Sequence, residues 1–450
     1  MTTLENAYQS ALDYIYRFVD YSRTHHDQLS VDDFDLSRME EFIRKLGRPD
    51  RDYQNLHVAG SKGKGSVSAF CASCLQAQGY RVGLFTSPHL KDFEERIQVN
   101  GEPISRRELV DLLEELKPLI ESFQYPTTFE IITALGLTYF SRREVDLAVI
   151  EVGLGGRLDS TNVITPALSV ITALYLDHTP ILGDTIPEIA AEKGGIIKPG
   201  VPVIVAPQQD PAADRTLKAI AEKQQAPISF VRDRYRYRVL GKSLQGQTFS
   251  VEELEPAGPA AQAATLKIPL LGEFQVENAV TAYAALQALN RQGISISPGA
   301  VTKGFQEVNW PGRFEVLSRN PTLIVDSAHN PASCQLLMET IREFFPEQPV
   351  TLLFGISADK QLPGMLDALL PEVESVITTQ ADHPRAMDAR ELAAFIRSRG
   401  GKAEAVPVVK DALEKALAAA QPEEVILAAG SIFVAASARI AWLERSRYRL

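Results

Sequence analysis

A glycine-rich segment with a central lysine carries the clearest chemical signal in the chain. Residues 55–66 read NLHVAGSKGKGS, so a short apolar run leads into three glycines, and an amphipathic stretch follows. Gly60, Gly63 and Gly65 allow backbone N–H groups to turn toward one anion, and a helix that begins here adds the positive end of its dipole. Lys64 supplies a mobile positive charge for terminal phosphates. The segment therefore predicts a strand, a phosphate-binding loop and a helix, with ATP as the expected ligand.

The segment departs from the common phosphate-loop pattern at its metal-binding position. That pattern places a Ser or Thr directly after the lysine, and the hydroxyl binds Mg²⁺. Here Gly65 follows Lys64, and glycine has no hydroxyl. Either Ser66 reaches the metal from one position later, or another residue binds it. A glycine-rich turn without a ligand is the alternative interpretation.

Polar residues follow further apolar runs in the first half of the chain, namely Ser87, Glu151 and His178. Functional groups gather at the carboxyl ends of parallel strands. Because Mg²⁺ prefers hard oxygen ligands, Glu151 is the best candidate ligand among these residues. Ser87 offers the hydroxyl that the loop lacks, and His178 is a softer ligand that can complete a second metal site. As single residues they are weak evidence, since a lone histidine is more often an ordinary core or surface residue, but together at successive strand ends they favour a metal site.

Lys193 lies in a second cluster, EKGGIIK at residues 192–198. A lysine held near two metal ions is strained unless it loses its positive charge. A neutral amine can take up CO₂ and become a carbamate, which is an oxygen ligand. The residues by themselves favour an ordinary helix lysine.

The second half of the chain repeats the pattern of polar groups after an apolar run. Asp326 and His329 belong to such a segment, and Arg313 lies shortly before it. A fixed guanidinium matches the geometry of a phosphate or a carboxylate, although a solvated charge in a hinge explains Arg313 equally well. Residues 359–360 and 383–385 are further polar clusters after apolar runs, and we expect them to line a cleft between two domains.

These residues need elements that position them, and residues 1–307 alternate apolar runs with helical patterns. We expect strands at 56–59, 82–86, 147–151, 168–174 and 201–206, and helices at 66–78, 106–122, 129–140, 186–196 and 276–289. The alternation predicts a mostly parallel sheet with helices on both faces. At about 230–270, charged residues alternate with aromatic ones between turn signals, which predicts a small antiparallel appendage.

A second α/β domain is predicted at residues 314–450, after a hinge at 308–313. We expect strands at 323–326, 350–354, 375–378 and 424–428, and helices at 334–345, 388–398 and 410–420. The expected fold class is therefore α/β with two domains. An ATP-binding domain at 1–307 contains the phosphate loop, and a smaller Rossmann-like domain follows it.

The composition limits the classes of function. The formal net charge is −11 and the isoelectric point is near 5.3, which argues against nucleic-acid binding. No run of about 18 apolar residues predicts a membrane span, and the N-terminus does not resemble a secretory signal. Cys71 and Cys74 have the spacing of a redox or zinc pair, but their apolar neighbours favour buried cysteines. We expect a cytoplasmic protein.

These segments together resemble the folylpolyglutamate synthase/dihydrofolate synthase family, which is related to the Mur ligases of cell-wall synthesis. The resemblance covers nearly the whole chain. It rests on ordered motifs, which are HVAGSKGKGS at 57–66, TSPHL at 86–90, ERI at 95–97, TFE at 128–130, EVGLGGRLD at 151–159, DH at 177–178, EKGGIIK at 192–198, PGR at 311–313 and DSAHNP at 326–331. The chain differs from many bacterial members at two places. It has Ser61–Lys62 where they have Thr-Asn, and Ser327 where a glycine is common.

The resemblance implies roles for individual residues. The expected nucleotide contacts are Gly60, Gly63, Lys64, Gly65, Ser66, Asn278, Arg313 and Asp326. The residues that match the family's magnesium ligands are Ser87, Glu151 and His178, and Lys193 matches its carbamylated lysine. His329 lies in the segment that faces the incoming amino acid, so Lys64, Lys193 and His329 are the expected catalytic side chains. The segments that match the pterin-binding regions contain Asp33, Phe34, Asp35, Leu36, Thr127, Thr128, Phe129, Glu130, Leu158, Asp159 and Ser160.

The function that the resemblance implies is that of an ATP-dependent amide ligase. A carboxylate of a reduced folate or of dihydropteroate would attack the γ-phosphate of ATP, and L-glutamate would then displace phosphate from the acyl phosphate. Domain closure would keep water away from this intermediate. The expected cofactors are ATP and Mg²⁺, with two metal ions, and the expected oligomeric state is a monomer. The alternatives are a Mur-type ligase acting on a UDP-sugar peptide and a non-catalytic ATP-dependent switch.

Overall fold

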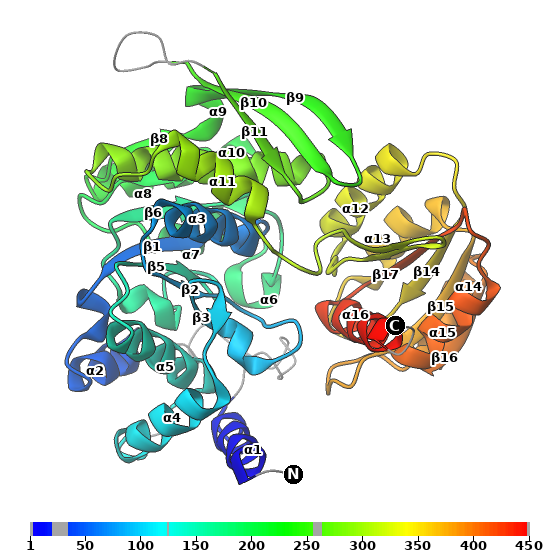
Figure 1. Ribbon diagram of the computed structural model, residues 1–450, viewed down its shortest axis with the longest axis horizontal. Helices are drawn as coiled ribbons and strands as arrows, with labels where there is room; N and C mark the ends of the chain where they lie inside the picture. Colours follow the sequence, from blue (N-terminus) through cyan, green and yellow to red (C-terminus); the bar gives the residue numbers. More distant parts are fainter. Residues whose placement is uncertain (1–2, 20–34, 124–125, 255–262, 448–450) are drawn as a thin grey trace. The chain divides into compact units, whose positions relative to one another are not determined.

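The computed structural model describes residues 3–19, 35–123, 126–254 and 263–447, and Figure 1 traces them from blue to red. Contacts between Cα atoms divide the chain into two compact units. Unit 1 comprises the described residues of Met1–Leu240, Thr248–Ile268 and Val276–Asn309. Unit 2 comprises those of Gly241–Gln247, Pro269–Gln275 and Trp310–Leu450. Each unit is described by itself below.

Unit 1 contains a mostly parallel sheet, as predicted. Its eight strands lie in the order β4-β3-β2-β5-β1-β6-β7-β8. The strands are β1 (Gln54–Ala59), β2 (Val82–Phe85), β3 (Ile97–Val99), β4 (Glu102–Pro103), β5 (Leu147–Glu151), β6 (Leu168–Ile171), β7 (Val203–Val205) and β8 (Ile228–Phe230). Neighbouring strands from β2 to β8 run parallel, and β3 is antiparallel to both β2 and β4. The parallel strands therefore end at one edge of the sheet.

Helices cover both faces of this sheet. In β5, Ala148 and Ile150 pack in a core with residues from the helices near the N-terminus, and Leu147 and Val149 on the opposite face are buried as well. The helices are α1 (Thr3–Tyr16), α2 (Leu36–Lys45), α3 (Lys64–Gln78), α4 (Arg106–Ile120), α5 (Thr128–Arg142), α6 (Thr179–Leu182), α7 (Ile186–Gly194), α8 (Pro211–Lys223), α9 (Val231–Arg234), α10 (Glu273–Arg291) and α11 (Pro298–Glu307). Because both faces are buried, the strands read as continuous apolar runs.

The two cysteines of α3 belong to a close helix–helix contact. Helix α11, which the sequence did not predict, packs against α3. A Cβ atom at Gly304 would lie 2.5 Å from the Cα atom of Cys74, so the contact requires glycine at this position. Cys71 and Cys74 are fully buried, and burial raises the pKa of the Cys71 thiol to about 12. The expectation of buried apolar cysteines is confirmed.

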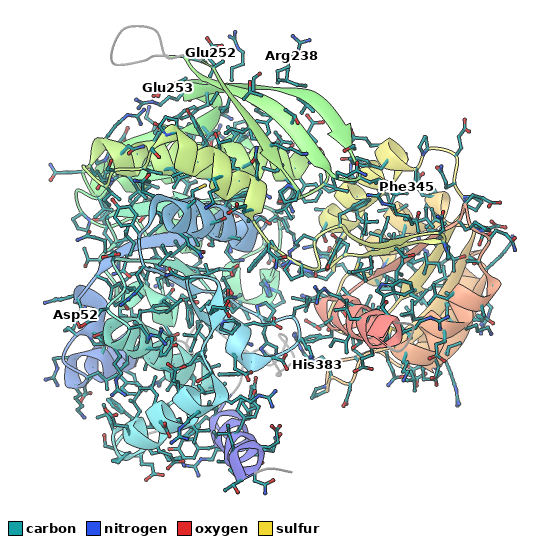
Figure 2. The ribbon with its side chains drawn as sticks, in the orientation of Figure 1. Asp52, Arg238, Glu252, Glu253, Phe345 and His383 are labelled. Carbon is teal, nitrogen blue, oxygen red and sulfur yellow. The ribbon has the colours of Figure 1, made fainter. Side chains whose placement is uncertain are left out.

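Three strands form a separate small sheet in the order β11-β10-β9. They are β9 (Tyr235–Ser243), β10 (Gly246–Glu253) and β11 (Ala264–Ile268), and the two-residue connection between β9 and β10 makes them a hairpin. Along β9, Tyr235 is buried and Arg236 and Arg238 are exposed. Figure 2 shows Arg238 at the outer surface of this sheet, with Glu252 of the neighbouring strand also labelled there. The alternation of charged and aromatic residues is thus that of a strand with one solvated face.

Unit 2 contains a six-stranded sheet in the order β12-β13-β17-β14-β15-β16. Its strands are β12 (Glu315–Arg319), β13 (Thr322–Val325), β14 (Val350–Phe354), β15 (Ser375–Gln380), β16 (Ala403–Val408) and β17 (Val425–Ala429). Only the pair β12–β13 is antiparallel among these pairs. The helices are α12 (Pro331–Phe344), α13 (Leu362–Leu369), α14 (Ala389–Ser398), α15 (Val409–Ala419) and α16 (Ile432–Arg447). In β14, Leu352 and Leu353 belong to separate cores on the two faces.

None of the helices within the described residues has the length and hydropathy that a membrane crossing requires.

Candidate functional site

The glycine-rich segment forms a tight loop between β1 and α3, as predicted. Strand β1 ends at Ala59 and helix α3 begins at Lys64. A Cβ atom at Gly60 would lie 1.8 Å from Thr172 Oγ1, and one at Gly63 would lie 2.2 Å from Asn278 Oδ1. Gly63 also has a positive φ of 88°. The loop backbone is therefore in close contact with the residue that follows β6 and with α10, and Asn278 lies at the loop.

The first turn of α3 offers backbone N–H groups to an anion. The first hydrogen bond of the helix runs from the N–H of Val67 to the carbonyl of Gly63. The N–H groups before Val67 in α3 therefore have no acceptor within the helix. The ammonium group of Lys64 donates to the carbonyl of Gly60 over 3.2 Å. The lysine thus folds back over its own loop, where the terminal phosphates of a nucleotide would lie.

Ser87 and Glu151 come together because β2 and β5 are neighbours in the sheet. The backbone N–H of Ser87 donates to Glu151 Oε2 over 3.1 Å, and Glu151 is buried. Strand β5 also pairs with β1, with Glu151 opposite Val58. The carboxylate therefore lies at the same edge of the sheet as the phosphate loop.

The donor set at this edge fits Mg²⁺. Within the part of the chain that the structure describes, no three His, Cys, Asp or Glu side chains are grouped closely enough to hold a metal ion. A magnesium site needs few protein ligands, because phosphate oxygens and water fill most of its six positions. Glu151 and the hydroxyl of Ser87 suit such a site. The imidazole of His178 lies beside the carboxylate of Asp177, with Nε2 at 3.8 Å from Oδ1.

Lys193 is buried in the C-terminal part of α7. Burial, reinforced by the positive charge of Lys64, lowers the pKa of the Lys193 ammonium from 10.5 to about 7, whereas the charge of Asp177 acts in the opposite direction. Gly156 lies against this part of the helix, since a Cβ atom there would come within 2.8 Å of the carbonyl oxygen of Glu192. Burial and the nearby positive charge therefore favour the neutral amine of Lys193 over its ammonium form.

Several residues of the expected pterin-binding segments have their side chains engaged in helix starts. Thr127 and Glu130 form a capping box at the start of α5, and the hydroxyl of Thr128 donates to the carbonyl of Ile15. The carboxylate of Glu130 also accepts from Arg38 Nε over 2.8 Å. Asp35 caps α2 by accepting from the N–H of Ser37.

The remaining residues of these segments differ in exposure. Asp159 is buried and accepts from the N–H groups of Leu154 and Thr161 over 2.8 and 3.0 Å, and burial raises the pKa of its carboxyl group. The side chains that stay partly exposed are Leu36, Phe129, Leu158 and Ser160. Asp33 and Phe34 lie outside the described residues.

In unit 2, Asp326 holds the turn that contains Arg313. The carboxylate of Asp326 accepts from the N–H of Phe314 over 2.8 Å and from the N–H of Ala328 over 2.7 Å. The hydroxyl of Ser327 donates to the carbonyl of Gly312 over 2.9 Å. These bonds place Arg313, half-buried, beside the carboxyl end of β13.

His329 and Asn330 lie in the segment between the end of β13 and the start of α12. His329 Nδ1 lies 2.8 Å from the carbonyl oxygen of Ser327, and Asn330 caps helix α12. The structure therefore brings Arg313, Asp326 and His329 to one edge of the sheet of unit 2.

Comparison with known proteins decides the family. Residues 58–286 match the Mur ligase middle domain, and residues 312–432 match the glutamate ligase domain of Mur ligases. A dihydrofolate synthase/folylpolyglutamate synthase from Bacillus subtilis is 38% identical over 371 residues, which are 79% of this chain and 83% of the relative. The chain belongs to the folylpolyglutamate synthase/dihydrofolate synthase family.

Other members agree with this assignment. The structure of a Mycobacterium tuberculosis folylpolyglutamate synthase complexed with ADP is similar, with a TM-score of 0.86, 29% identity and coverage of 98% of this chain and 99% of that one. A probable bifunctional folylpolyglutamate synthase/dihydropteroate synthase from Halobacterium salinarum is 37% identical. That match spans 89% of this chain but only 49% of the relative. These names favour a folate-type ligase over a UDP-sugar ligase and over a switch.

This family member contains one buried network that the sequence did not reveal. His57 on β1 is fully buried, and its Nε2 lies 2.9 Å from Thr161 Oγ1. The hydroxyl of Thr161 donates to Asp159, so Nε2 of His57 carries the hydrogen. Burial, with the charge of Lys198, lowers the pKa of His57 to about 3. A lone histidine inside an apolar strand next to the phosphate loop is the only signal that the sequence offered for this network.

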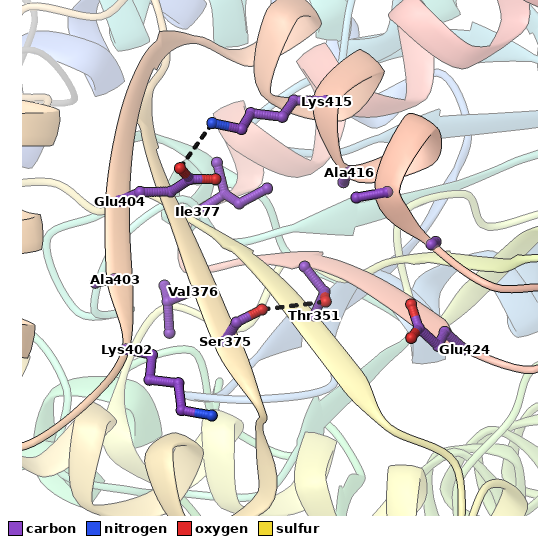
Figure 3. A pocket seen from close by; sticks show the side chains of 12 residues that line it. Thr351, Ser375, Val376, Ile377, Lys402, Ala403, Glu404, Lys415, Ala416 and Glu424 are labelled. Atoms are coloured by element: carbon purple, nitrogen blue, oxygen red, sulfur yellow. Dashed lines mark hydrogen bonds and ion pairs between the residues drawn. The ribbon is translucent and has the colours of Figure 1, made fainter.

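The cavity shown in Figure 3 lies elsewhere in this family member. It has a volume of about 330 Å³ and is lined by residues such as Thr351, Ser375, Lys402 and Glu404. These residues stand at or before the amino ends of β14, β15 and β16. The candidate site residues of unit 2 lie at the carboxyl end of β13, so this cavity is not part of the candidate site.

Proposed function

We propose that the chain joins L-glutamate to the carboxylate of a folate-type substrate, with ATP as the source of energy. One observation carries most of the weight. The loop before Lys64 has no room for a Cβ atom at Gly60 or Gly63, and the ammonium group of Lys64 lies over this loop. The buried Glu151 stands at the end of the adjoining strand. Such an edge suits a triphosphate with its metal ion, and the names of the relatives support a folate-type carboxylate as the acceptor.

The proposed reaction has two steps. A carboxylate oxygen of the substrate attacks the γ-phosphorus of ATP, and ADP leaves, which gives an acyl phosphate. The nitrogen of L-glutamate then attacks the acyl carbon, phosphate leaves, and the nitrogen loses a proton. Lys64 and the N–H groups at the start of α3 balance the charge that develops on the transferred group. When bound at Ser87, Glu151 and His178, Mg²⁺ would supply further charge neutralisation, and we propose two such ions.

Lys193 would act as a carbamate. Its amine is buried and has a pKa near 7, so the neutral form is available to attack the carbon of CO₂ and release a proton. The product carries a negative charge, which suits the neighbourhood of Lys64 better than an ammonium group does. Carbon-13 NMR with labelled bicarbonate tests this, because a carbamate signal that Lys193→Met removes is expected. A spectrum without that signal in the wild type would contradict the modification.

We assign the remaining roles by the matched motifs. Asn278, Arg313 and Asp326 would contact the nucleotide, and His329 would face the incoming amino acid. The pterin would be held by the partly exposed Leu36, Phe129, Leu158 and Ser160, whereas Asp35, Thr127, Thr128, Glu130 and Asp159 would act mainly by fixing the backbone around it. This division follows from the hydrogen bonds that the latter side chains already make.

The test is phosphate release with Mg-ATP and L-glutamate, in the presence of either dihydropteroate or tetrahydrofolate. We expect release that depends on the pterin, and its ratio for the two substrates distinguishes dihydrofolate synthesis from extension of the glutamate tail. Release that does not depend on any pterin would contradict the proposal. We also propose that the protein is cytoplasmic and monomeric. The elution volume in gel filtration tests whether it is a monomer.

A further inference from the structure

The phosphate loop is bound to the segment that follows β6. The backbone N–H groups of Ser61 and Lys62 both donate to the carbonyl of Ala173, each over 3.0 Å. The hydroxyl of Ser61 donates to the carbonyl of Tyr175 over 3.0 Å. Every one of these bonds comes from Ser61 or Lys62, the two loop positions that lie between Gly60 and Gly63.

The side chain of Lys62 extends this contact to the residue before His178. Lys62 Nζ lies 3.2 Å from Asp177 Oδ2, and the two side chains are 17% and 9% exposed. The other carboxylate oxygen of Asp177 accepts from the backbone N–H of His178 over 3.1 Å. The ion pair is therefore screened little by water, and one carboxylate group links Lys62 to the backbone N–H of His178.

His178 needs such support because its backbone conformation is unfavourable. Its φ of 53° and ψ of 37° lie in the left-handed region, which is unfavourable for a residue with a side chain because the Cβ atom comes too close to the following carbonyl oxygen. The hydrogen bond from its N–H to Asp177 compensates part of this cost, and Lys62 fixes the carboxylate that accepts the bond.

We propose that Lys62 and Asp177 form a clasp that positions His178 against the phosphate loop for the binding of a magnesium–nucleotide complex. Lys62 is then a positioning residue, and Lys64 is the lysine that contacts the phosphates. The inference rests on the proposed function in that it takes the loop to bind a nucleotide. It goes beyond that function by giving Lys62 a task different from that of Lys64.

The test measures ADP binding by calorimetry over a series of Mg²⁺ concentrations, and again with a chelator. No pterin or glutamate is needed. Lys62→Met and Asp177→Asn should each raise the Mg²⁺ concentration for half-maximal ADP binding by about 5-fold, the effect of one partly buried ion pair. The double variant should be no worse than either single variant, because both remove the same contact. ADP binding without Mg²⁺ should stay within about 2-fold of the wild type.

Lys415→Met is the matched control, since it breaks an exposed ion pair with Glu404 in unit 2, where Nζ and Oε2 are 2.7 Å apart. It should leave all the binding curves unchanged. If Lys62→Met does not fold, Lys62→Gln and the charge-reversed pair Lys62→Asp with Asp177→Lys replace it, and the reversed pair should restore part of the Mg²⁺ dependence.

Two results would overturn the clasp. One is a loss of Mg²⁺-free ADP binding in Lys62→Met that Asp177→Asn does not share, since this would make Lys62 a phosphate ligand. The other is an additive effect of the two substitutions. In both cases the wild type still binds ADP and the proposed function stands. A wild type that does not bind ADP would contradict the proposed function as well.

Discussion

Polar residues follow the carboxyl ends of parallel strands in both units, yet the two edges are built differently. At the edge of unit 1, glycines bring the backbone against Thr172 and Asn278. The positive charges of Lys64 and Lys62 lie close enough to Lys193 to lower the pKa of its ammonium group. At the edge of unit 2, the carboxylate of Asp326 accepts two backbone N–H groups.

We infer from this difference that the same position in an α/β sheet can serve two tasks. An edge with cations and backbone N–H donors is suited to receive an anion. A buried carboxylate that is already bonded to the backbone fixes a turn and the side chains on it. Substitutions at the first edge should therefore change binding and catalysis, and substitutions at the second should change stability first.

The largest effect is expected for Lys64→Ala in unit 1. Without this charge, the transferred phosphoryl group loses a stabilising cation, and kcat/KM should fall by about 10³-fold. The free energy of unfolding should change little, because the ammonium group bonds only to the carbonyl of Gly60 among the contacts described here. Phosphate release and urea denaturation measure the two quantities. Lys45→Ala, at an exposed position of α2, is the control. An unaffected kcat/KM in Lys64→Ala would show that Lys64 does not contact the transferred phosphoryl group.

Asp326→Ala tests the other edge. It leaves the buried N–H groups of Phe314 and Ala328 without an acceptor, so unit 2 should lose about 2–4 kcal/mol of stability. Asp367→Ala, which removes an exposed partner of Arg399 in the same unit, should change stability by less than about 0.5 kcal/mol. Chemical denaturation followed by circular dichroism compares the two. Equal stabilities would mean that Asp326 does not hold the turn.

Gly63→Ala measures how tightly the phosphate loop is packed. Gly79 is the matched control, because its φ of 104° is also positive but no atom lies within 4 Å of a Cβ there. Both alanine variants should lose about 1–2 kcal/mol through backbone strain. Only Gly63→Ala should also weaken ADP binding, by about 10-fold, since its Cβ would displace Asn278. Calorimetric titration checks this, and equal ADP affinities of the two variants would contradict the close contact.

The last effect, which is the smallest per pH unit, concerns the pH dependence that His57 adds to the stability of unit 1. The unfolded chain takes up a proton at this ring near pH 6.5, whereas the buried ring does so only near pH 3. Stability should therefore fall as the pH drops from 6.5 toward 3, by about 1 kcal/mol per pH unit from this residue. His57→Gln should flatten the fall, while Thr161→Val should lower stability without changing its slope. His89, whose pKa burial also lowers to about 3, adds to the slope of every variant. Equal slopes in the wild type and His57→Gln would contradict this contribution.

Much of the fold could be predicted because fully buried parallel strands read as apolar runs. The bounds of β5 and β14 agree with the expected runs 147–151 and 350–354. Two elements without a clear pattern, β16 and α16, were not predicted. Strand β16 has exposed and half-buried residues and includes Pro407, so it shows no apolar run. Helix α16 lacks the periodicity of an amphipathic helix, because its apolar and charged residues are not separated onto opposite faces.

The candidate site was predictable where one segment carries the chemistry and unpredictable where two segments meet. The glycines and the lysine of the phosphate loop lie within one short segment, so their spacing was enough to predict the loop. The bond from Phe314 to Asp326 joins residues 12 positions apart, and the pair of Lys62 and Asp177 spans 115 positions. Thr127 and Glu130 were assigned to a pterin-binding segment by the resemblance alone, and only the structure shows that they form the capping box at the start of α5.

Unit 2 is assembled from three separate stretches of chain, since Gly241–Gln247 and Pro269–Gln275 belong to it together with Trp310–Leu450. The ammonium of Lys242, for example, bonds to Glu343 within that unit. A gene split at codon 310 would consequently yield a C-terminal half that lacks two of its own pieces. Independent expression of this half would need both pieces to be grafted back or supplied as peptides.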